Sequence, residues 1–277
     1  MKKLLTLLAL STFILTSCSS NQSRTASSVV DYLYSGKAKQ VKRRTPHLTL
    51  PLNIGIAFVP EKYHDDNSLP EAKKMLLLEN VSDKFRALKF VEKISVVPSS
   101  YLRSRGGFDN LDQISSLYGF DVVALVSYDQ TQFTDSSRAS LTYTTLIGAY
   151  FIPGEKNDTS TLLDTAVFDI KSRNMLFRAP GTNFLKGKSA PVNLSKELRE
   201  DSEKSFNLAA IDMTNNLEKE MATFRESIKK KPDTVTIDYK KGHTQQSTGG
   251  ALCAPLFVLL LGFLGLVYRR KIRLDRH

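Results

Sequence analysis

Cysteine, histidine and tryptophan are scarce in this sequence of 277 residues, which holds two, four and none of them, respectively. Cys18 and Cys253 are the two cysteines, so the long region between them must fold without a disulfide. Cys253 lies in an apolar run, where a small apolar residue is ordinary and acylation is the alternative.

Catalytic motifs are missing too. The sequence has no GxSxG elbow, no phosphate-cradling loop and no HExxH, and RSRGGF lacks the glycine spacing of a nucleotide site. Asp164 and Asp169 share one strand-like stretch, but their odd separation predicts opposite faces rather than an acid/base pair. We therefore predict that the chain is not an enzyme and uses no cofactor.

A metal site has one weak candidate. His64, Asp65 and Asp66 offer ligand atoms, but no second cluster accompanies them, so an exposed polar loop before a helix explains them as well. We predict no metal.

The net charge of +11 is concentrated at the two ends. Without the signal lysines and the basic tail, the remaining region carries +5, which argues against nucleic acid as a partner. Part of this charge lies in GKAKQVKRR, residues 36–44, a basic linker that either contacts lipid phosphates or is simply solvated.

The first residues have the plan of a secretory signal. Lys2 and Lys3 precede an apolar stretch that is too short to span a bilayer comfortably, and small residues follow it. Leu15-Thr16-Ser17-Cys18 resembles the bacterial lipobox, which implies that Cys18 is lipidated and becomes the first residue of the mature protein. An ordinary signal peptide with an incidental thiol is the alternative.

The carboxyl end has the plan of a membrane anchor. Residues 251–268 carry no charge and would give about 27 Å of helix, which is close to the hydrocarbon thickness. Arg269, Arg270, Lys271 and Arg273 follow directly and mark the cytoplasmic side, so the bulk of the chain is expected on the other side.

Between these ends the sequence predicts an α/β domain. LNIGIAFVP, FVEKISVVP and DVVALVSYDQ read as strands, with a helix after each of the first two. Ser68 and Glu71 are spaced as a capping box, Asp109 is a candidate N-cap, and Gly119 a candidate C-cap. The first half therefore predicts helices packed on a sheet.

The second half has α+β character. The alternation in residues 141–151 and the stretches TLLDTAVFDI and NMLFRA, joined by KSRN, predict antiparallel strands. From Leu194 to about Lys230 apolar residues recur every three or four positions, which predicts a long amphipathic helix packed on the domain or on a partner. The prediction is a mixed sheet with packed helices, a long carboxyl-terminal helix, and then a single transmembrane helix.

The predicted parts are a lipoprotein signal peptide (1–17), a lipidated amino end with a basic linker (18–46), an exported α/β domain (47–231), a polar stalk (232–250), a transmembrane helix (251–268) and a cytoplasmic tail (269–277).

Two family resemblances follow from these features. The element order and SSLYGFDVVALVSY are loosely similar to the periplasmic domains of curli-secretion-type lipoproteins. Gly249-Gly250, before one hydrophobic helix and an Arg-rich end, resembles the GlyGly-CTERM sorting signal cut by rhombosortase, a rhomboid-family protease. With the lipobox, the chain is similar to rhombotarget lipoproteins. Paired glycines suit such a cut because they form helix poorly and leave the backbone open.

These resemblances imply a cell-envelope lipoprotein, lipidated at Cys18, cut near Gly249-Gly250 and delivered to the outer membrane or cell surface as a binding or assembly module. Its expected partners are membrane lipids, lipoprotein maturation enzymes, a rhombosortase-type protease and an envelope protein. An uncleaved tether held by lipid and helix, and a hydrolase with an unrecognised site, are the alternatives.

Overall fold

The computed structural model describes residues 20–34, 44–61, 69–136, 155–189 and 193–241. Its strands are β1 (Ser20–Ala26), β2 (His47–Leu50), β3 (Leu52–Phe58), β4 (Val91–Val96), β5 (Val122–Ser136), β6 (Glu155–Asp169), β7 (Asn174–Ser189) and β8 (Thr236–Tyr239). Its α-helices are α2 (Val29–Leu33), α3 (Glu71–Arg86), α4 (Gly107–Tyr118) and α6 (Leu194–Lys230). These elements belong to one compact unit that ends at Lys240.

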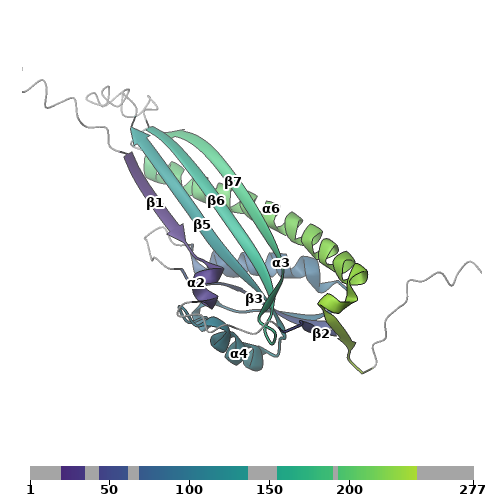
Figure 1. Cartoon of the computed structure of the whole chain (residues 1–277). Helices are drawn as coiled ribbons and strands as arrows, with labels where there is room; N and C mark the ends of the chain where they lie inside the picture. The colour runs from purple at the N-terminus through teal and green to yellow at the C-terminus, as the bar shows by residue number, and fades with distance from the viewer. Residues whose placement is uncertain (1–19, 35–43, 62–68, 137–154, 190–192, 242–277) are drawn as a thin grey trace, which may run out of the picture. The chain divides into compact units, whose positions relative to one another are not determined.

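The main sheet has the order β4-β3-β5-β6-β7, and β1 also pairs with β5. The first residues of β5 pair in parallel with β3, whereas residues 129–135 pair antiparallel with β1. Strands β1 and β3 therefore lie end to end along the same side of β5, as Figure 1 shows.

The predicted β-α-β-α-β start is confirmed as β3-α3-β4-α4-β5, with parallel strands. Alternate residues of β5 enter two apolar cores on opposite faces of the sheet. Val122 and Val126 pack with α3 and α6, whereas Val123 and Leu125 pack with α2 and α4. The predicted mixed sheet with helices packed on it is therefore present.

The predicted helix ends need two corrections. Helix α4 begins at Gly107, so Asp109 lies in its first turn and does not cap it, whereas Gly119 is the C-cap in the left-handed conformation with φ of 74°. Helix α3 begins after Pro70 without a side-chain cap, and the Glu71 carboxylate accepts hydrogen bonds from Ser99 instead. Ser68 lies outside the described residues.

The antiparallel second half is confirmed for β6 and β7, which form a hairpin across the predicted turn. The predicted long helix is α6, whose 37 residues extend about 55 Å. Of its apolar stripe, Phe206, Ala209 and Met213 are buried on the sheet. Strand β7 and helix α6 come so close at Gly181 that an added Cβ would lie 2.2 Å from the Met213 nitrogen.

The folded unit extends beyond residues 47–231 in both directions. Strand β1 and helix α2 lie within residues 18–46, which were predicted as a lipidated amino end with a basic linker, and β8 lies within the predicted stalk. Strand β8 pairs in parallel with β2 and forms a separate two-stranded sheet.

Among the described residues no helix is both long and apolar enough to cross a membrane. The predicted transmembrane helix at 251–268 and the predicted strand at 141–151 lie outside the described residues.

Candidate functional site

The two ends of the described unit lie far apart. In the sheet register, Ser20 is opposite Asp135, Asp135 is opposite Lys156, and Lys156 is opposite Lys188, so all four lie in one row at one end of the sheet. Strand β8 lies at the opposite end, beyond the carboxyl end of α6 (Figure 1). The chain therefore enters the fold at one end and leaves it at the other.

Strand β1 is fixed to the sheet by polar contacts rather than by apolar packing. Arg24 forms an ion pair with Asp129 at 2.6 Å, and the Ser27 amide donates to the Tyr128 carbonyl at 2.8 Å. The Ser28 side chain accepts a hydrogen bond from the Asp31 amide and caps α2. The chain is thus part of the folded sheet from Ser20, two residues after Cys18.

Strand β8 is fixed at the other end by contacts with two strands. His47 Nε2 lies 2.7 Å from Asp238 Oδ2, and the Lys240 amide donates to the Leu50 carbonyl at 2.9 Å. The Lys240 side chain forms an ion pair with Glu92 of β4. These contacts hold the chain to the unit as far as Lys240.

A groove of about 860 Å³ lies between the amino-terminal halves of α3 and α6. Tyr128 and Phe206 contribute to its lining, and their rings meet edge to face with centroids 5.6 Å apart. Lys73 of α3 and Glu203 of α6 also line it and form a 3.0 Å ion pair. A groove of this size, with apolar and charged walls, could hold a small ligand or a peptide segment.

A buried ion pair lies near this groove, after the carboxyl end of β3. Lys74 Nζ is 2.7 Å from Glu61 Oε1, and the two side chains are 11% and 3% exposed. Although the contact qualifies as an ion pair, neither carboxylate oxygen has a well-oriented hydrogen bond from the described residues. Burial raises the pKa of Tyr128 far above its usual value, and the Glu61 charge acts in the same direction.

The contact between residues 198–205 of α6 and the sheet is polar. Gln130 donates to Thr161 at 2.8 Å, and Gln132 donates to the Leu198 carbonyl at 2.8 Å. Further bonds join Thr161 to Ser205 and Asn157 to Asp201. Buried polar groups that are paired in this way hold the helix in one position on the sheet.

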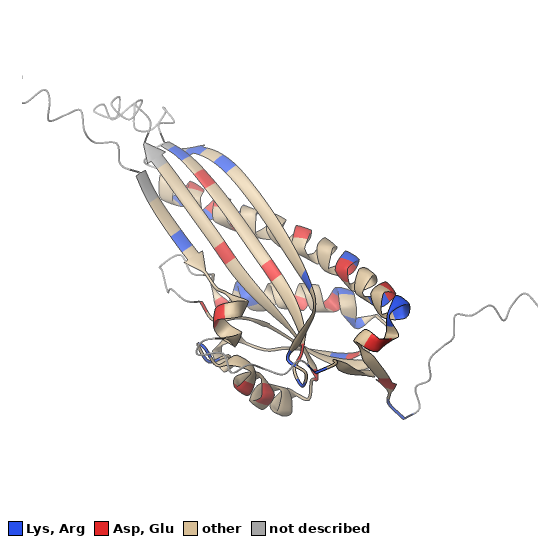
Figure 2. Ribbon diagram, viewed as in Figure 1, with Lys and Arg blue, Asp and Glu red and all other residues tan. Residues whose placement is uncertain are grey.

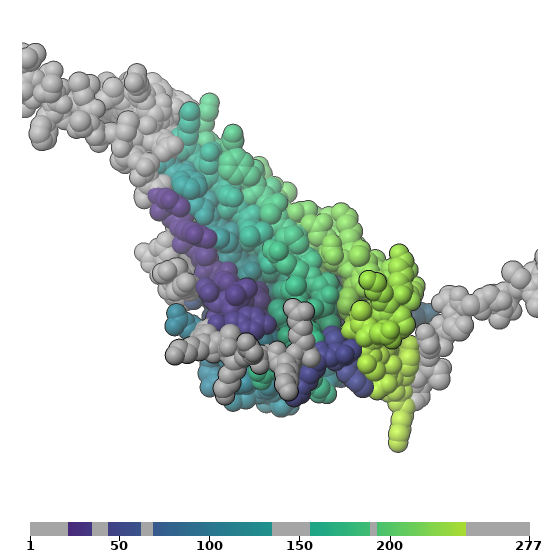
Figure 3. Space-filling view, in the orientation of Figure 1, coloured from purple at the N-terminus to yellow at the C-terminus, as the bar shows by residue number. Residues whose placement is uncertain are grey.

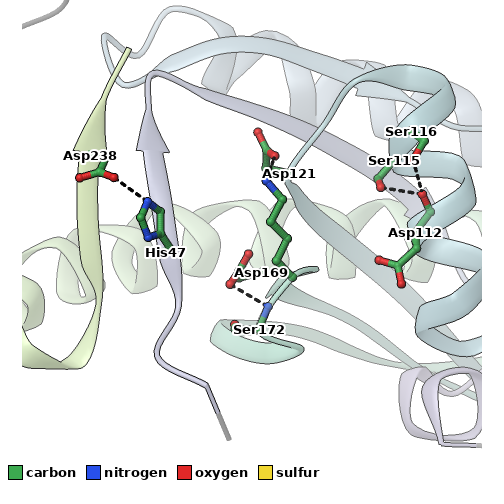
Figure 4. A network of polar contacts seen from close by, with 9 residues as sticks. His47, Asp112, Ser115, Ser116, Asp121, Asp169, Ser172 and Asp238 are labelled. Carbon is green, nitrogen blue, oxygen red and sulfur yellow. Dashed lines mark hydrogen bonds and ion pairs between the residues drawn. The ribbon is translucent and has the colours of Figure 1, made fainter. Parts of the chain in front are cut away.

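Of the acidic and serine residues in Figure 4, Asp121 pairs with Lys171 and Asp238 with His47, whereas the others form hydrogen bonds within their own elements or across a short turn. Asp169 Oδ2 accepts from the Ser172 amide at 3.1 Å, and Ser115 and Ser116 both donate to the Asp112 carbonyl at 2.9 Å. His47 faces Asp238, and no hydrogen bond joins it to a serine among the described residues. This arrangement offers no nucleophile with an attached base.

Asp164 and Asp169 of β6 lie in different surroundings and have different partners. Asp164 accepts two 2.7 Å bonds from Arg178 on the face opposite α6, whereas Asp169 is buried in the β6–β7 turn. They do not form the paired carboxylates of a general acid and base.

No group of three or more possible metal ligands occurs in the described ranges. His64, Asp65 and Asp66 lie outside them, as do Cys18, the Gly249-Gly250 pair and the basic cluster Arg269, Arg270, Lys271 and Arg273.

Sequence reasoning missed the Glu61–Lys74 pair, the groove and the polar contact beneath α6. The groove and the ion pair depend on residues far apart in the sequence, and no local pattern reveals them. The polar contact did leave a signal, because Tyr128, Gln130 and Gln132 alternate along one face of β5.

Comparison with known proteins gives no family. A scan against protein-family models and a search of curated proteins both gave no match. One similar solved structure is a neuraminyllactose-binding hemagglutinin homolog from Helicobacter pylori, at 10% identity and a TM-score of 0.38, covering 72% of this chain and 98% of that one. Another is a PelC dodecamer from Paraburkholderia phytofirmans, at 7% identity and a TM-score of 0.27, covering 71% and 99%. At these TM-scores the likeness carries no functional argument.

Proposed function

We propose that this chain is a bacterial cell-envelope lipoprotein, exported, lipidated at Cys18 and released from a carboxyl-terminal anchor by a rhombosortase-type protease near Gly249-Gly250. It then acts at the outer membrane or cell surface as a non-enzymatic binding or assembly module.

The observation that carries this proposal is the position of β1. Strand β1 begins at Ser20, two residues after Cys18, and its pairing with β5 needs nothing from the segment before the cysteine. A signal peptide could therefore be removed at Cys18 without disturbing the sheet.

The other end of the unit is compatible with cleavage. Gly249 follows Lys240 by nine residues, and those residues can reach at most about 31 Å. The described fold ends at β8 and its contacts, so removal of the chain beyond Gly250 takes no described strand or helix away.

The uncleaved tether remains a second candidate because the two chain exits lie at opposite ends of the unit. Attachment points at opposite ends suit a protein that connects two membranes.

The test is the intact mass of the protein from its native membranes, with and without the candidate protease gene. We expect lipid mass on Cys18 in both strains and loss of the segment after the glycine pair only when the protease is present. Gly249→Leu with Gly250→Leu should block the loss, whereas Gly242→Leu, a glycine earlier in the same segment, should not. A complete tail in both strains would reject sorting and leave the tether.

The hydrolase alternative is tested separately at the groove, with a panel of ester, peptide and glycoside substrates. Turnover that Tyr128→Phe or Lys73→Met abolishes would favour an enzyme over a binding module.

A further inference from the structure

The row that contains Ser20 also holds an unusual pair of charges. Lys156 of β6 and Lys188 of β7 are directly opposite each other, and both are exposed. Like charges in directly opposed positions destabilise a sheet. The pair therefore does not help the domain to fold. Strands lie about 4.8 Å apart, which places Lys188 about 14 Å from Ser20.

Lys186 adds a third charge beside the pair. Asn157 points toward α6, where it bonds Asp201, so by alternation Lys156, Lys186 and Lys188 lie on the other face. Lys186 lies over the Phe184 ring at 5.6 Å. Among the described residues none of the three lysines forms an ion pair, although Asp135 is opposite Lys156 and Asp158 is opposite Lys186 in the register.

These three lysines, Lys156, Lys186 and Lys188, form the basic tip. Figure 2 shows it as the blue segments at one end of β6 and β7, and Figure 3 looks onto the same face of β1, β5, β6 and β7. No described helix covers the upper part of this face, because α2 and α4 pack on the lower part.

We propose that the basic tip docks on anionic lipid headgroups, so that the domain stands on its membrane with this end of the sheet against the surface. The proposal rests on lipidation at Cys18, because two residues of chain reach only about 7 Å and hold Ser20 close to the lipid surface. The phosphate charges of the headgroups complement the lysines, and each lysine near such a surface strengthens the contact about fivefold.

The test is lysine footprinting of the native protein. Intact membranes are treated with an amine-acylating reagent, and the modification of each lysine is compared with that of detergent-solubilised protein by mass spectrometry. We expect the basic tip to be protected several-fold in membranes only. Lys230 and Lys231, exposed at the far end of α6, are the internal controls and should react equally in both.

The electrostatic part is tested after reconstitution into vesicles. Protection should occur with phosphatidylglycerol present, weaken as salt is raised, and be absent in phosphatidylcholine alone. Lys196, in the first turn of α6 just after β7, should be protected with the basic tip in the unaltered protein. In a variant with Lys156→Gln, Lys186→Gln and Lys188→Gln, Lys196 should lose this protection, whereas Lys230→Gln with Lys231→Gln should leave it unchanged.

The same spectra report the mass on Cys18, so the two proposals fail separately. Lipid on Cys18 with equal labelling of the basic tip in membranes and detergent overturns the docking alone. Protection without lipid on Cys18 supports the docking and overturns the lipidation. Protection that is independent of lipid charge and salt also overturns the proposed headgroup contact.

Discussion

Loss of the Lys74 charge should destabilise the fold far more than loss of its neighbour Lys73. Lys74→Met leaves the Glu61 carboxylate charged, 3% exposed and without a cation. Breaking a buried pair in this way costs about 3–5 kcal/mol. Because Lys74 itself is 11% exposed, we expect the cost to lie at the lower end of this range. Lys74→Met should lower the free energy of unfolding by about 3 kcal/mol.

Two variants make the comparison quantitative. Lys73 is in the same turn of α3, but it and its partner Glu203 are 42% and 57% exposed, so Lys73→Met should cost at most about 0.5 kcal/mol. The double variant Lys74→Met with Glu61→Leu removes both buried charges and should recover most of the lost stability, since an apolar pair of similar volume often replaces a buried ion pair without loss.

The assay is urea denaturation of the detergent-solubilised chain, followed by far-ultraviolet circular dichroism. A cost below about 1 kcal/mol for Lys74→Met, or a double variant as unstable as that single variant, would refute the reasoning.

Three further predictions use the same denaturation assay. Gly181→Ala brings a Cβ within 2.3 Å of the α6 backbone and should cost about 3 kcal/mol, whereas Gly119→Ala meets no atom within 4 Å and should cost only about 1 kcal/mol for its positive φ. Gln130→Leu removes the hydrogen bonds that Gln130 donates to Thr161 of β6 and to the Ser202 carbonyl of α6 and should cost about 1–3 kcal/mol, with an unchanged stability counting against the polar contact. Burial raises the pKa of Tyr32 and Tyr128, so the stability they contribute should be complete below pH of about 10 and be lost as the pH rises further; a variant with Tyr32→Phe and Tyr128→Phe whose stability falls as steeply above pH of about 10 would contradict this.

The sequence was informative wherever apolar periodicity and burial coincide. Strands β3, β4 and the first part of β5 are buried by helices on the sheet, and α6 packs through an apolar stripe, so each has the pattern its environment requires. Gly119 was identifiable for a similar reason, since its left-handed backbone strongly favours glycine.

The elements that were missed have no such pattern. Strand β1 reads SNQSRTA and is a strand because β5 supplies its partners, which a local window cannot reveal. Strand β8 is four residues long and depends on β2, about 190 residues earlier in the chain. The second part of β5 faces α6 through glutamines, so its apolar alternation ends before the strand does.

The positions of β1 and β8 limit how the proposed anchors can act together. Helix α6 keeps the two ends of the unit about 55 Å apart, whereas the chain from Lys240 to Gly250 reaches only about 34 Å. If Cys18 lipid and an anchor after Gly250 share one membrane, the unit cannot stand upright on its basic tip, since its far end would lie beyond the reach of the anchor. Cleavage at the glycine pair would remove that constraint. Lysine footprinting of Gly249→Leu with Gly250→Leu should therefore show weaker protection of the basic tip than the processed protein, and equal protection would mean that the two anchors do not lie in the same membrane.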